Sequence, residues 1–330
     1  TVATNNNVTG QSNQATGQAS ISQTLTNTSN TVQILTYTVT PTSGAAGSCV
    51  GPTFQVAVTV NPRPSIVNET IAACSNAPIT YTATQGSNGN IVPTNTLYSW
   101  TIKTDNANIT GKTAQPTPQA TFTQTLRNTT NVQRVIVYTL TPISGTCAGT
   151  PFDLTVQVNP TPEIAAKTTA ICSAETFTIS PTDGFMNMVS ASIDIVPTGT
   201  TFTWTVVTNN NVTGESSVAT AQPSISQALT NTTNTVQTVI YTVTPRSGDT
   251  GNCIGQPFQV SVQVNPKPFV LPINETVCSA SPFTITPANG NGNIVPTGTT
   301  YSWTFVDNAS VTGEAIGTAQ PNFTQTLTNT

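Results

Sequence analysis

The chain has 330 residues, which is enough for two or three domains of ordinary size. Only 6% of the residues are charged, with 8 Lys+Arg against 12 Asp+Glu, and there is no histidine. This weakly acidic chain has no basic patch for nucleic acid and no polybasic segment for anionic lipid, so we expect neither partner. No apolar run approaches the roughly 20 residues that cross a bilayer, so we expect no membrane insertion within this sequence.

One pattern returns about every 101 residues. The stretch "TVATNNNVTG" at 1–10 reappears as "TVVTNNNVTG" at 205–214 and as "TFVDNASVTG" at 304–313. A fixed period of this length indicates tandem copies of one module. Because the pattern is interrupted at both ends, we expect the sequence to be a window on a longer protein. The predicted divisions are the C-terminal part of one repeat (1–62), two complete repeats (63–160 and 161–266) and the N-terminal part of a further repeat (267–330).

Short alternating runs within each repeat predict β-strands. Residues 54–60, 152–158 and 258–264 alternate apolar and polar side chains, which puts one face in a core and the other in water. No stretch shows a sustained 3.6-residue period. About seven short strands in roughly 100 residues, with a tryptophan on the third, are typical of a two-sheet immunoglobulin-like sandwich. We therefore predict an all-β chain of β-sandwich repeats arranged end to end.

Aromatic residues recur at strand positions and are predicted to lie in the cores. The motif "YTVTP" at 37–41 and 241–245 returns as "YTLTP" at 138–142, and its tyrosine is expected to begin the sixth strand while its proline ends it. The predicted core markers are Trp100, Trp204, Trp303, Tyr37, Tyr138 and Tyr241.

Six cysteines form three pairs, each separated by 25 positions: Cys49 and Cys74, Cys147 and Cys172, Cys253 and Cys278. An even, regular set in a Thr- and Asn-rich β protein indicates an oxidising, extracellular setting. Metal binding is not expected, because neither a CxxC motif nor a histidine is present to complete a tetrahedral site.

The connectivity of the cysteines leaves alternatives open. The pairings Cys74–Cys147 and Cys172–Cys253 would stay within one repeat, but a simple sandwich holds those positions at opposite ends. Strands of this length separate them by more than about 20 Å, whereas a disulfide needs Cα atoms about 6 Å apart. Stacking repeats head to tail brings Cys74 near Cys253, so we favour that bridge across a junction. Bridges within repeats and free thiols remain the alternatives.

The residues that catalysis needs are missing or scattered. Without histidine, no Ser-His-Asp or Cys-His arrangement is possible. Acidic residues such as Glu163, Glu175, Asp183 and Asp194 do not recur together in every repeat, so we expect them to be solvated loop residues. No calcium-binding loop and no phosphate-binding glycine motif occurs. We therefore predict no enzyme activity, no catalytic residue, no cofactor and no metal.

One insertion departs from the repeat. Gly184 to Pro197 spans 13 positions, about twice the equivalent stretches elsewhere, and the added segment contains both methionines. We favour a longer loop that packs on the protein itself. The alternative is an exposed apolar tip that contacts a partner, made of Phe185, Met186 and Met188.

Four stretches carry a resemblance: "TVCSASPFTITPANGNGNIVPTGTTYSWT", "FTQTLTNT", "VIYTVTPRSGDTGNC" and "PFQVSVQVNPKP". They resemble the PKD-like, immunoglobulin-like repeats of giant surface proteins of Bacteroidota, of which the gliding adhesin of flavobacteria is the best-known bearer. The resemblance covers the whole sequence and implies type IX secretion and display on the cell surface as a filament or stalk. The resemblance assigns no functional residue to this sequence.

The resulting hypothesis is a structural stalk of a cell-surface adhesin, serving attachment and gliding motility through weak multivalent contact. The expected partners are neighbouring repeats of the same chain, surface polysaccharide, and the secretion and motility machinery. Two alternatives remain. One is an array of carbohydrate-binding modules, which would show a recurring exposed aromatic platform. The other is an accessory region of a larger secreted enzyme.

Overall fold

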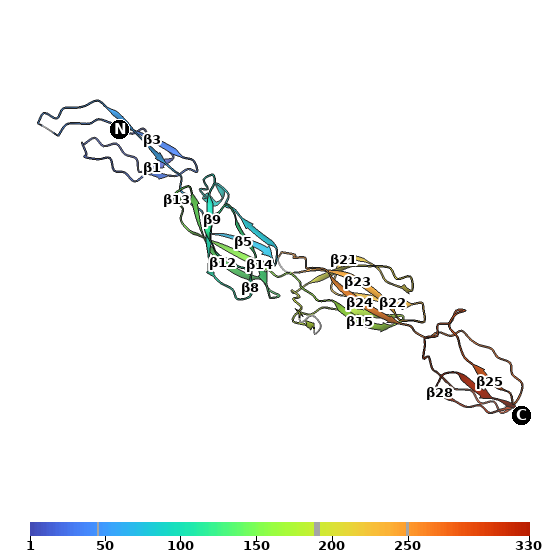
Figure 1. Cartoon of the computed structure of the whole chain (residues 1–330). Coiled ribbons are helices and arrows are strands. Elements are labelled where there is room, and N and C mark those ends of the chain that lie inside the picture. The colour runs from blue at the N-terminus through green and yellow to red at the C-terminus, as the bar shows by residue number, and fades with distance from the viewer. Residues whose placement is uncertain (45, 188–191, 249–250) are drawn as a thin grey trace. The chain divides into compact units, whose positions relative to one another are not determined.

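The computed structural model describes residues 1–44, 46–187, 192–248 and 251–330. Within these ranges the chain is all-β, apart from a single 3-10 turn at Ser87–Gly89 (Figure 1). None of the described residues belongs to a helix long and apolar enough to cross a membrane. The chain divides into two compact units, Thr1–Thr161 and Pro162–Thr330. Each unit contains one complete β-sandwich and one partial repeat.

The complete repeat of the first unit is built from ten strands. They are β5 (Glu69–Cys74), β6 (Pro78–Tyr81), β7 (Leu97–Thr104), β8 (Ile109–Thr110), β9 (Gln115–Gln119), β10 (Phe122–Thr125), β11 (Arg127–Asn128), β12 (Arg134–Ser144), β13 (Cys147–Ala148) and β14 (Phe152–Asn159). One sheet has the order β5-β14-β12-β7-β9, with β13 paired to β12. The pairs β10–β6 and β11–β8 make up the opposing layer.

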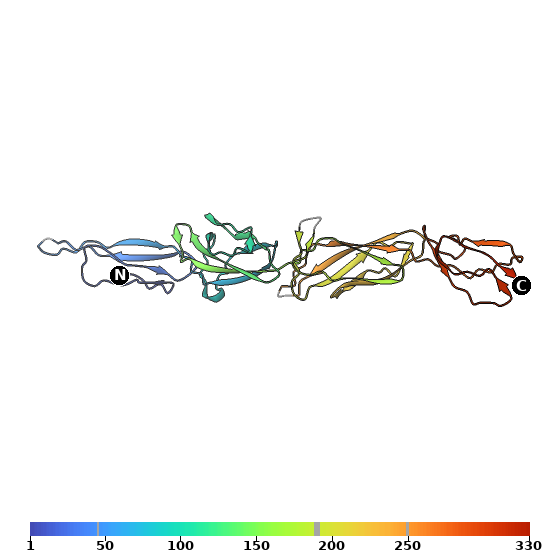
Figure 2. The ribbon, with the colours of Figure 1, turned by 90° about the horizontal axis from the view of Figure 1, so that it is seen from below.

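The complete repeat of the second unit follows the same plan. Its strands are β15 (Lys167–Cys172), β16 (Glu175–Ile179), β17 (Met186–Asn187), β18 (Ser192–Ile193), β19 (Thr201–Val206), β20 (Val212–Thr213), β21 (Val218–Gln222), β22 (Ile225–Asn231), β23 (Gln237–Arg246) and β24 (Phe258–Asn265). One sheet has the order β15-β24-β23-β19-β21 and the other β16-β22-β20. This repeat is the yellow-green to orange part of the ribbon in Figure 2. The pair β17–β18 is an added hairpin.

The two partial repeats contain subsets of these strands. Residues 1–62 form the pairs β1 (Val8–Thr9) with β2 (Thr26–Asn27) and β3 (Gln33–Val39) with β4 (Phe54–Val60). Residues 267–330 form β25 (Pro282–Ile285) with β29 (Phe323–Thr326), β26 (Tyr301–Trp303) with β28 (Gly317–Gln320), and β27 (Val311–Thr312) with β30 (Thr328–Asn329).

The alternating strands place their apolar residues between the two layers. In β14 and β24 every second residue is buried, and Leu154, Val156, Val260 and Val262 are fully buried. Burying a side chain of this size contributes about 1.5–3 kcal/mol. The first strand of each complete repeat pairs in parallel with the last, β5 with β14 and β15 with β24, and so forms one edge of the larger sheet. The predicted all-β sandwich fold is confirmed.

The predicted start of the tyrosine strand is wrong, and its predicted end at the proline holds only for β3, which ends at Val39 before Pro41. Strand β12 begins four residues before Tyr138 and runs past Pro142, and β23 behaves in the same way around Tyr241. Proline is tolerated because its missing N–H faces the turn to the next strand, where no N–H donor is required. The Pro142 carbonyl accepts the Gly149 N–H at 2.7 Å on that side.

The glycine of the recurring "VTG", which reads "ITG" at 109–111, is required by the backbone. The glycine has positive φ in all four copies, and at each one a Cβ atom would lie only 2.0–2.3 Å from a carbonyl oxygen of the neighbouring strand. These glycines are Gly10, Gly111, Gly214 and Gly313. Only glycine combines this dihedral with such a close approach.

Candidate functional site

The recurring tyrosine and tryptophan meet in a hydrogen-bonded network that also includes a recurring glutamine. In the second complete repeat, the Tyr241 hydroxyl donates to Gln227 Oε1 at 2.8 Å. Gln227 Nε2 donates to the Ser216 carbonyl at 2.8 Å, and Trp204 Nε1 donates to the same carbonyl at 3.0 Å. The polar tips of two large core side chains therefore have partners inside the fold, as buried polar groups require.

The first complete repeat has the same network. Tyr138 donates to Gln124 at 3.3 Å, and Trp100 Nε1 and Gln124 Nε2 both donate to the Thr113 carbonyl at 3.1 Å. Burial raises the pKa of both Tyr138 and Tyr241 far above the ordinary value, with a nearby carboxylate adding to the shift. The network therefore belongs to the core and offers no group to a ligand.

The partial repeats keep parts of this network. Tyr37 is buried and donates to Gln23 at 2.7 Å, while Trp303 is half-buried and donates to the Ala315 carbonyl at 2.9 Å. Sequence reasoning missed the glutamine. Its signal was recurrence, because Gln23, Gln124, Gln227 and Gln325 all follow the same pattern.

The asparagine of "LTNT" is a second internal anchor. Asn231 is buried, and its Nδ2 donates to the carbonyls of Thr235 at 2.7 Å and Val264 at 2.9 Å. Its Oδ1 accepts from the backbone N–H and the hydroxyl of Thr233, both at 2.8 Å. Asn27 and Asn128 repeat this arrangement. The motif thus fixes a loop to the last strand of the sandwich.

Among the described residues, the acidic side chains do not gather into a site, but the expectation that all are solvated is wrong for Asp194. Its carboxylate is fully buried and accepts from Lys167 Nζ at 2.5 Å and from the Ala165 N–H at 2.9 Å. Asp183 stays exposed and accepts the Val196 N–H at 2.9 Å. Glu175 is exposed and Glu163 half-buried.

The Lys167–Asp194 pair secures the base of the inserted hairpin. Lys167 Nζ lies 4.2 Å from the centre of the Phe185 ring, a cation–π contact. Phe185 and Met186 are both exposed, and Met186 pairs with Ile193 across the hairpin. Met188 lies outside the described residues. A role for this segment in contacting a partner stays a prediction.

The cysteines fall into two groups. Cys74 and Cys253 are disulfide-bonded, and the free thiols are Cys49, Cys147, Cys172 and Cys278. Since Cys147 and Cys172 are free, neither bridge within a repeat is present. In the first complete repeat, Cys74 pairs with Asn159 at one end of the large sheet and Cys147 with Ser144 at the other. The Cys74–Cys253 pairing itself stays a prediction.

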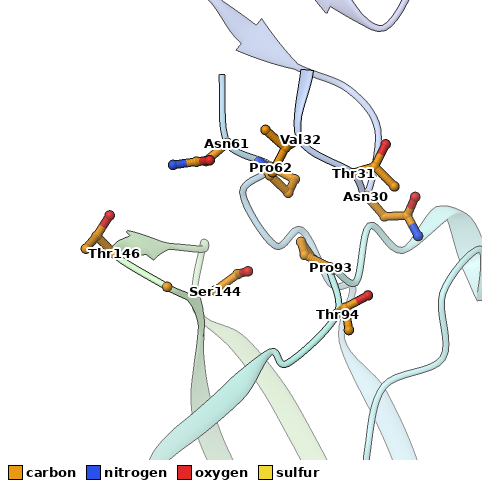
Figure 3. Close-up of a pocket in the computed structure, with 10 residues that line it drawn as sticks. Asn30, Thr31, Val32, Asn61, Pro62, Pro93, Thr94, Ser144 and Thr146 are labelled. Atoms are coloured by element: carbon orange, nitrogen blue, oxygen red, sulfur yellow. The ribbon is translucent and has the colours of Figure 1, made fainter. Parts of the chain in front are cut away.

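A shallow pocket of about 360 Å³ lies in the first unit (Figure 3). Its lining consists of Asn30, Thr31, Val32, Asn61, Pro62, Pro93, Thr94, Ser144, Gly145 and Thr146. These residues offer hydroxyl and amide groups beside two prolines, and none of them carries a charge. The pocket can accept hydrogen-bonding neutral groups, but it supplies neither an acid–base pair nor an activated nucleophile. Among the described residues, no cluster of three metal-ligating side chains occurs.

Comparison with known proteins agrees with this architecture. The PKD-like domain family matches the chain four times in succession, at residues 1–64, 71–162, 169–268 and 275–330. The chain therefore belongs to the PKD-like domain family. No curated protein matches it significantly.

Several solved structures show some similarity to the chain. An I-band fragment of titin is 6% identical, with 74% of this chain and 91% of that chain covered and a TM-score of 0.25. The human Desmocollin-1 ectodomain is 12% identical, with 91% and 59% covered and a TM-score of 0.25. The EC1-2 fragment of human mucin-like protocadherin is 14% identical, with 61% of this chain and 97% of that chain covered and a TM-score of 0.21.

Proposed function

We propose that the chain is a stalk segment of a cell-surface adhesin of the Bacteroidota gliding type, exported by the type IX secretion system. The observation that carries the proposal is the succession of four PKD-like modules, two of them complete sandwiches. Modules in tandem add length in proportion to their number, which suits a protein that must reach away from a cell. The disulfide-bonded cysteines fit an oxidising, extracellular setting.

The surface chemistry fits weak, repeated contact. With 6% charged residues, the exterior of each repeat presents mainly hydroxyl and amide groups. Such groups can bind surface polysaccharide weakly, and linking many modules raises the combined affinity. Few charges also make the contact insensitive to salt. The partners in this proposal are neighbouring repeats, surface polysaccharide, and the secretion and motility machinery.

The buried aromatic residues favour the stalk over a carbohydrate-binding module array. Trp100, Trp204, Tyr138 and Tyr241 recur from repeat to repeat, but all four lie in the cores. They cannot form the exposed platform on which a sugar ring would stack.

Antibodies raised against residues 63–266 test the proposal on intact cells of the organism that carries the gene. We expect the antibodies to label the cell surface, and external protease to remove the label. A strain without a functional type IX system should lose the label, and a strain without the gene should attach and glide poorly. Antigen confined to the cytoplasm, or unchanged attachment and gliding without the gene, would contradict the proposal.

A further inference from the structure

Strands β3 and β4 of the first partial repeat have open edges. In the complete repeat of the same unit, the equivalent strands β12 and β14 pair in the same register, and each has a further neighbour, β7 beside β12 and β5 beside β14. Among the described residues, β3 and β4 pair with each other, and the only further bridge to either strand joins Val2 to Tyr37. Most of both outer edges can therefore bind another strand.

The inward face of this strand pair lies beside an apolar hollow. Phe54 on β4 is 50% exposed, whereas the equivalent Phe152 on β14 is 3% exposed. The three inward valines of β4 are half-buried, although the matching residues of β14 are fully buried in the core. The hollow has a volume of about 1280 Å³, and its lining includes Tyr37, Val39, Phe54 and Val56. The first partial repeat therefore presents one half of a sandwich core.

Residues 267–330 show the opposite deficit. In the complete repeat of their own unit, β19 pairs with β23, and β15 pairs with β24. Strand β26 takes the place of β19 but pairs as a strand only with β28 among the described residues, and residues 273–278, equivalent to β15, form no strand. Trp303 is half-buried, while its equivalent Trp204 is buried. The missing neighbours are therefore the equivalents of β23 and β24.

We propose that β3 and β4 of one copy of this chain complete the partial repeat 267–330 of a second copy, with β3 beside β26 and β4 beside residues 273–278. The strand registers identify the occupant, because the equivalents of β3 and β4 fill these two places in both complete repeats. The pairs β12–β14 and β23–β24 are already enclosed in their own sheets, so β3–β4 is the pair with open edges. Strand addition of this kind supplies ladder hydrogen bonds and closes a core.

A second copy supplies the pair more readily than the same chain does. Two complete sandwiches, 63–160 and 161–266, separate β3–β4 from residues 267–330 along the sequence. Strands from another copy can therefore reach the open edges without either chain folding back on itself.

The second complete repeat shows which side chains meet in the completed sandwich. The ring centres of Phe258 on β24 and Phe202 on β19 lie 6.4 Å apart. The equivalent residues are Phe54 of one copy and Tyr301 of the other. This aromatic contact buries a side chain that is exposed in the single copy, and burial of that size favours association.

One segment is present twice and has to yield. Residues 304–330 of the acceptor copy already carry the equivalents of residues 1–28, so residues 1–28 of the donor copy move aside. Most of them are exposed. The bond from the Tyr37 hydroxyl to Gln23 is lost in this movement, and Gln325 of the acceptor copy takes the place of Gln23. The exchange keeps a buried hydrogen bond while it completes the core.

The donor strands and the acceptor repeat are different surfaces of one chain. Such a heterologous contact leaves a donor and an acceptor free in every complex, so association continues from copy to copy. This property goes beyond the proposed function and does not depend on adhesion or export.

Sedimentation velocity of the full chain over a range of concentrations tests the proposal, with the free thiols alkylated so that no disulfide links two copies. We expect a series of oligomers that grows with concentration. The donor variant F54K and the acceptor variant V277K should each weaken association roughly tenfold or more, because each buries a lysine in the new core. Val277 is equivalent to Ile171, which packs against the core of its repeat. Both changed residues are exposed in the single copy.

An equimolar mixture of the two variants shows whether the contact is heterologous. The V277K chain keeps an unchanged donor pair, and the F54K chain keeps an unchanged acceptor repeat. The mixture should therefore form a one-to-one dimer that does not grow further. A symmetric contact between identical faces would stay weakened in the mixture, and this result would overturn the proposal.

Matched controls add the same charge at positions that stay in water. Ile34 and Val306 are exposed, and so are their equivalents Val135 and Val207 in complete repeats. The variants I34K and V306K should associate like the unmodified chain, and circular dichroism with thermal melting confirms that every variant is folded. A chain that is monomeric at every concentration overturns the proposal, whether its ends stay open or close on each other. Oligomers unaffected by F54K and V277K also overturn it.

Discussion

Replacing Glu215 with glutamine should stabilise the second complete repeat. Glu215 Oε1 accepts the Asn209 N–H at 2.9 Å, but the buried Oε2 has no hydrogen-bond partner. The equivalent residue in the first partial repeat is Gln11. Its Oε1 makes the same bond to the Asn5 N–H at 3.2 Å, while its Nε2 donates to the Asn5 carbonyl at 2.8 Å.

In the first complete repeat, the residue at the equivalent position also donates a hydrogen bond to the backbone. Lys112 occupies this position there, and its Nζ donates to the Asn106 carbonyl at 2.9 Å. In E215Q the new Nε2 can donate to the Asn209 carbonyl, while Oε1 keeps its bond. The new hydrogen bond contributes about 1 kcal/mol to the stability of the fold. Replacing the unpaired buried oxygen with a hydrogen-bonded amide group removes a penalty of about 1–3 kcal/mol.

Differential scanning calorimetry measures this gain. For a repeat of about 100 residues, each kcal/mol shifts Tm by roughly 4–8 °C, so the transition of this repeat should move upward by at least about 4 °C. Glu275 is exposed, so E275Q makes the same change of charge without the same contacts and should leave Tm nearly unchanged. A Tm for E215Q equal to or below that of the unmodified chain would refute the reasoning.

Three further predictions follow from the cores and the cysteines. In N231A, the four hydrogen bonds of the Asn231 amide are lost, so the free energy of unfolding should fall by about 3 kcal/mol in denaturant titration. Stability should also fall above about pH 10, because the buried Tyr138 and Tyr241 have raised pKa values and keep their protons in the folded state while the unfolded chain ionises. Ultraviolet difference spectra should then show tyrosinate appearing together with unfolding, and tyrosinate appearing in the folded protein would contradict this. Peptide mapping under non-reducing conditions should recover a peptide that links Cys74 to Cys253. Recovery of these cysteines in other pairs would contradict the predicted disulfide across the junction.

The strands were predictable because their signal is local. The run at 258–264 alternates apolar and polar residues, and it forms β24 (Phe258–Asn265) almost residue for residue. The same rule recovers β4 and β14. Strand ends were harder to predict, because a proline ends a strand only when its missing N–H faces a partner. The missing N–H of Pro142 faces the turn to the next strand instead of a partner strand, so β12 continues past this proline.

Contacts between residues that lie far apart in the sequence could not be predicted from the sequence pattern. Lys167 and Asp194 belong to different elements, and nothing in their spacing shows that the fold buries them together. The equivalent residue elsewhere is asparagine, Asn90 or Asn293, which accepts the same backbone N–H without a charged partner. The change from asparagine to aspartate is therefore visible when the repeats are compared in sequence, but the identity of its lysine partner is not.

The buried asparagine of each loop also decides how the protein can be produced. Asn27, Asn128 and Asn231 each begin an Asn-Thr-Ser or Asn-Thr-Thr triplet, the acceptor sequence for N-linked glycans. In the folded repeats these side chains are inaccessible and both amide hydrogens are engaged. A eukaryotic secretory host could attach a sugar only before the repeat folds, and the modified loop could then no longer close onto the last strand. Expression in bacteria avoids that competition.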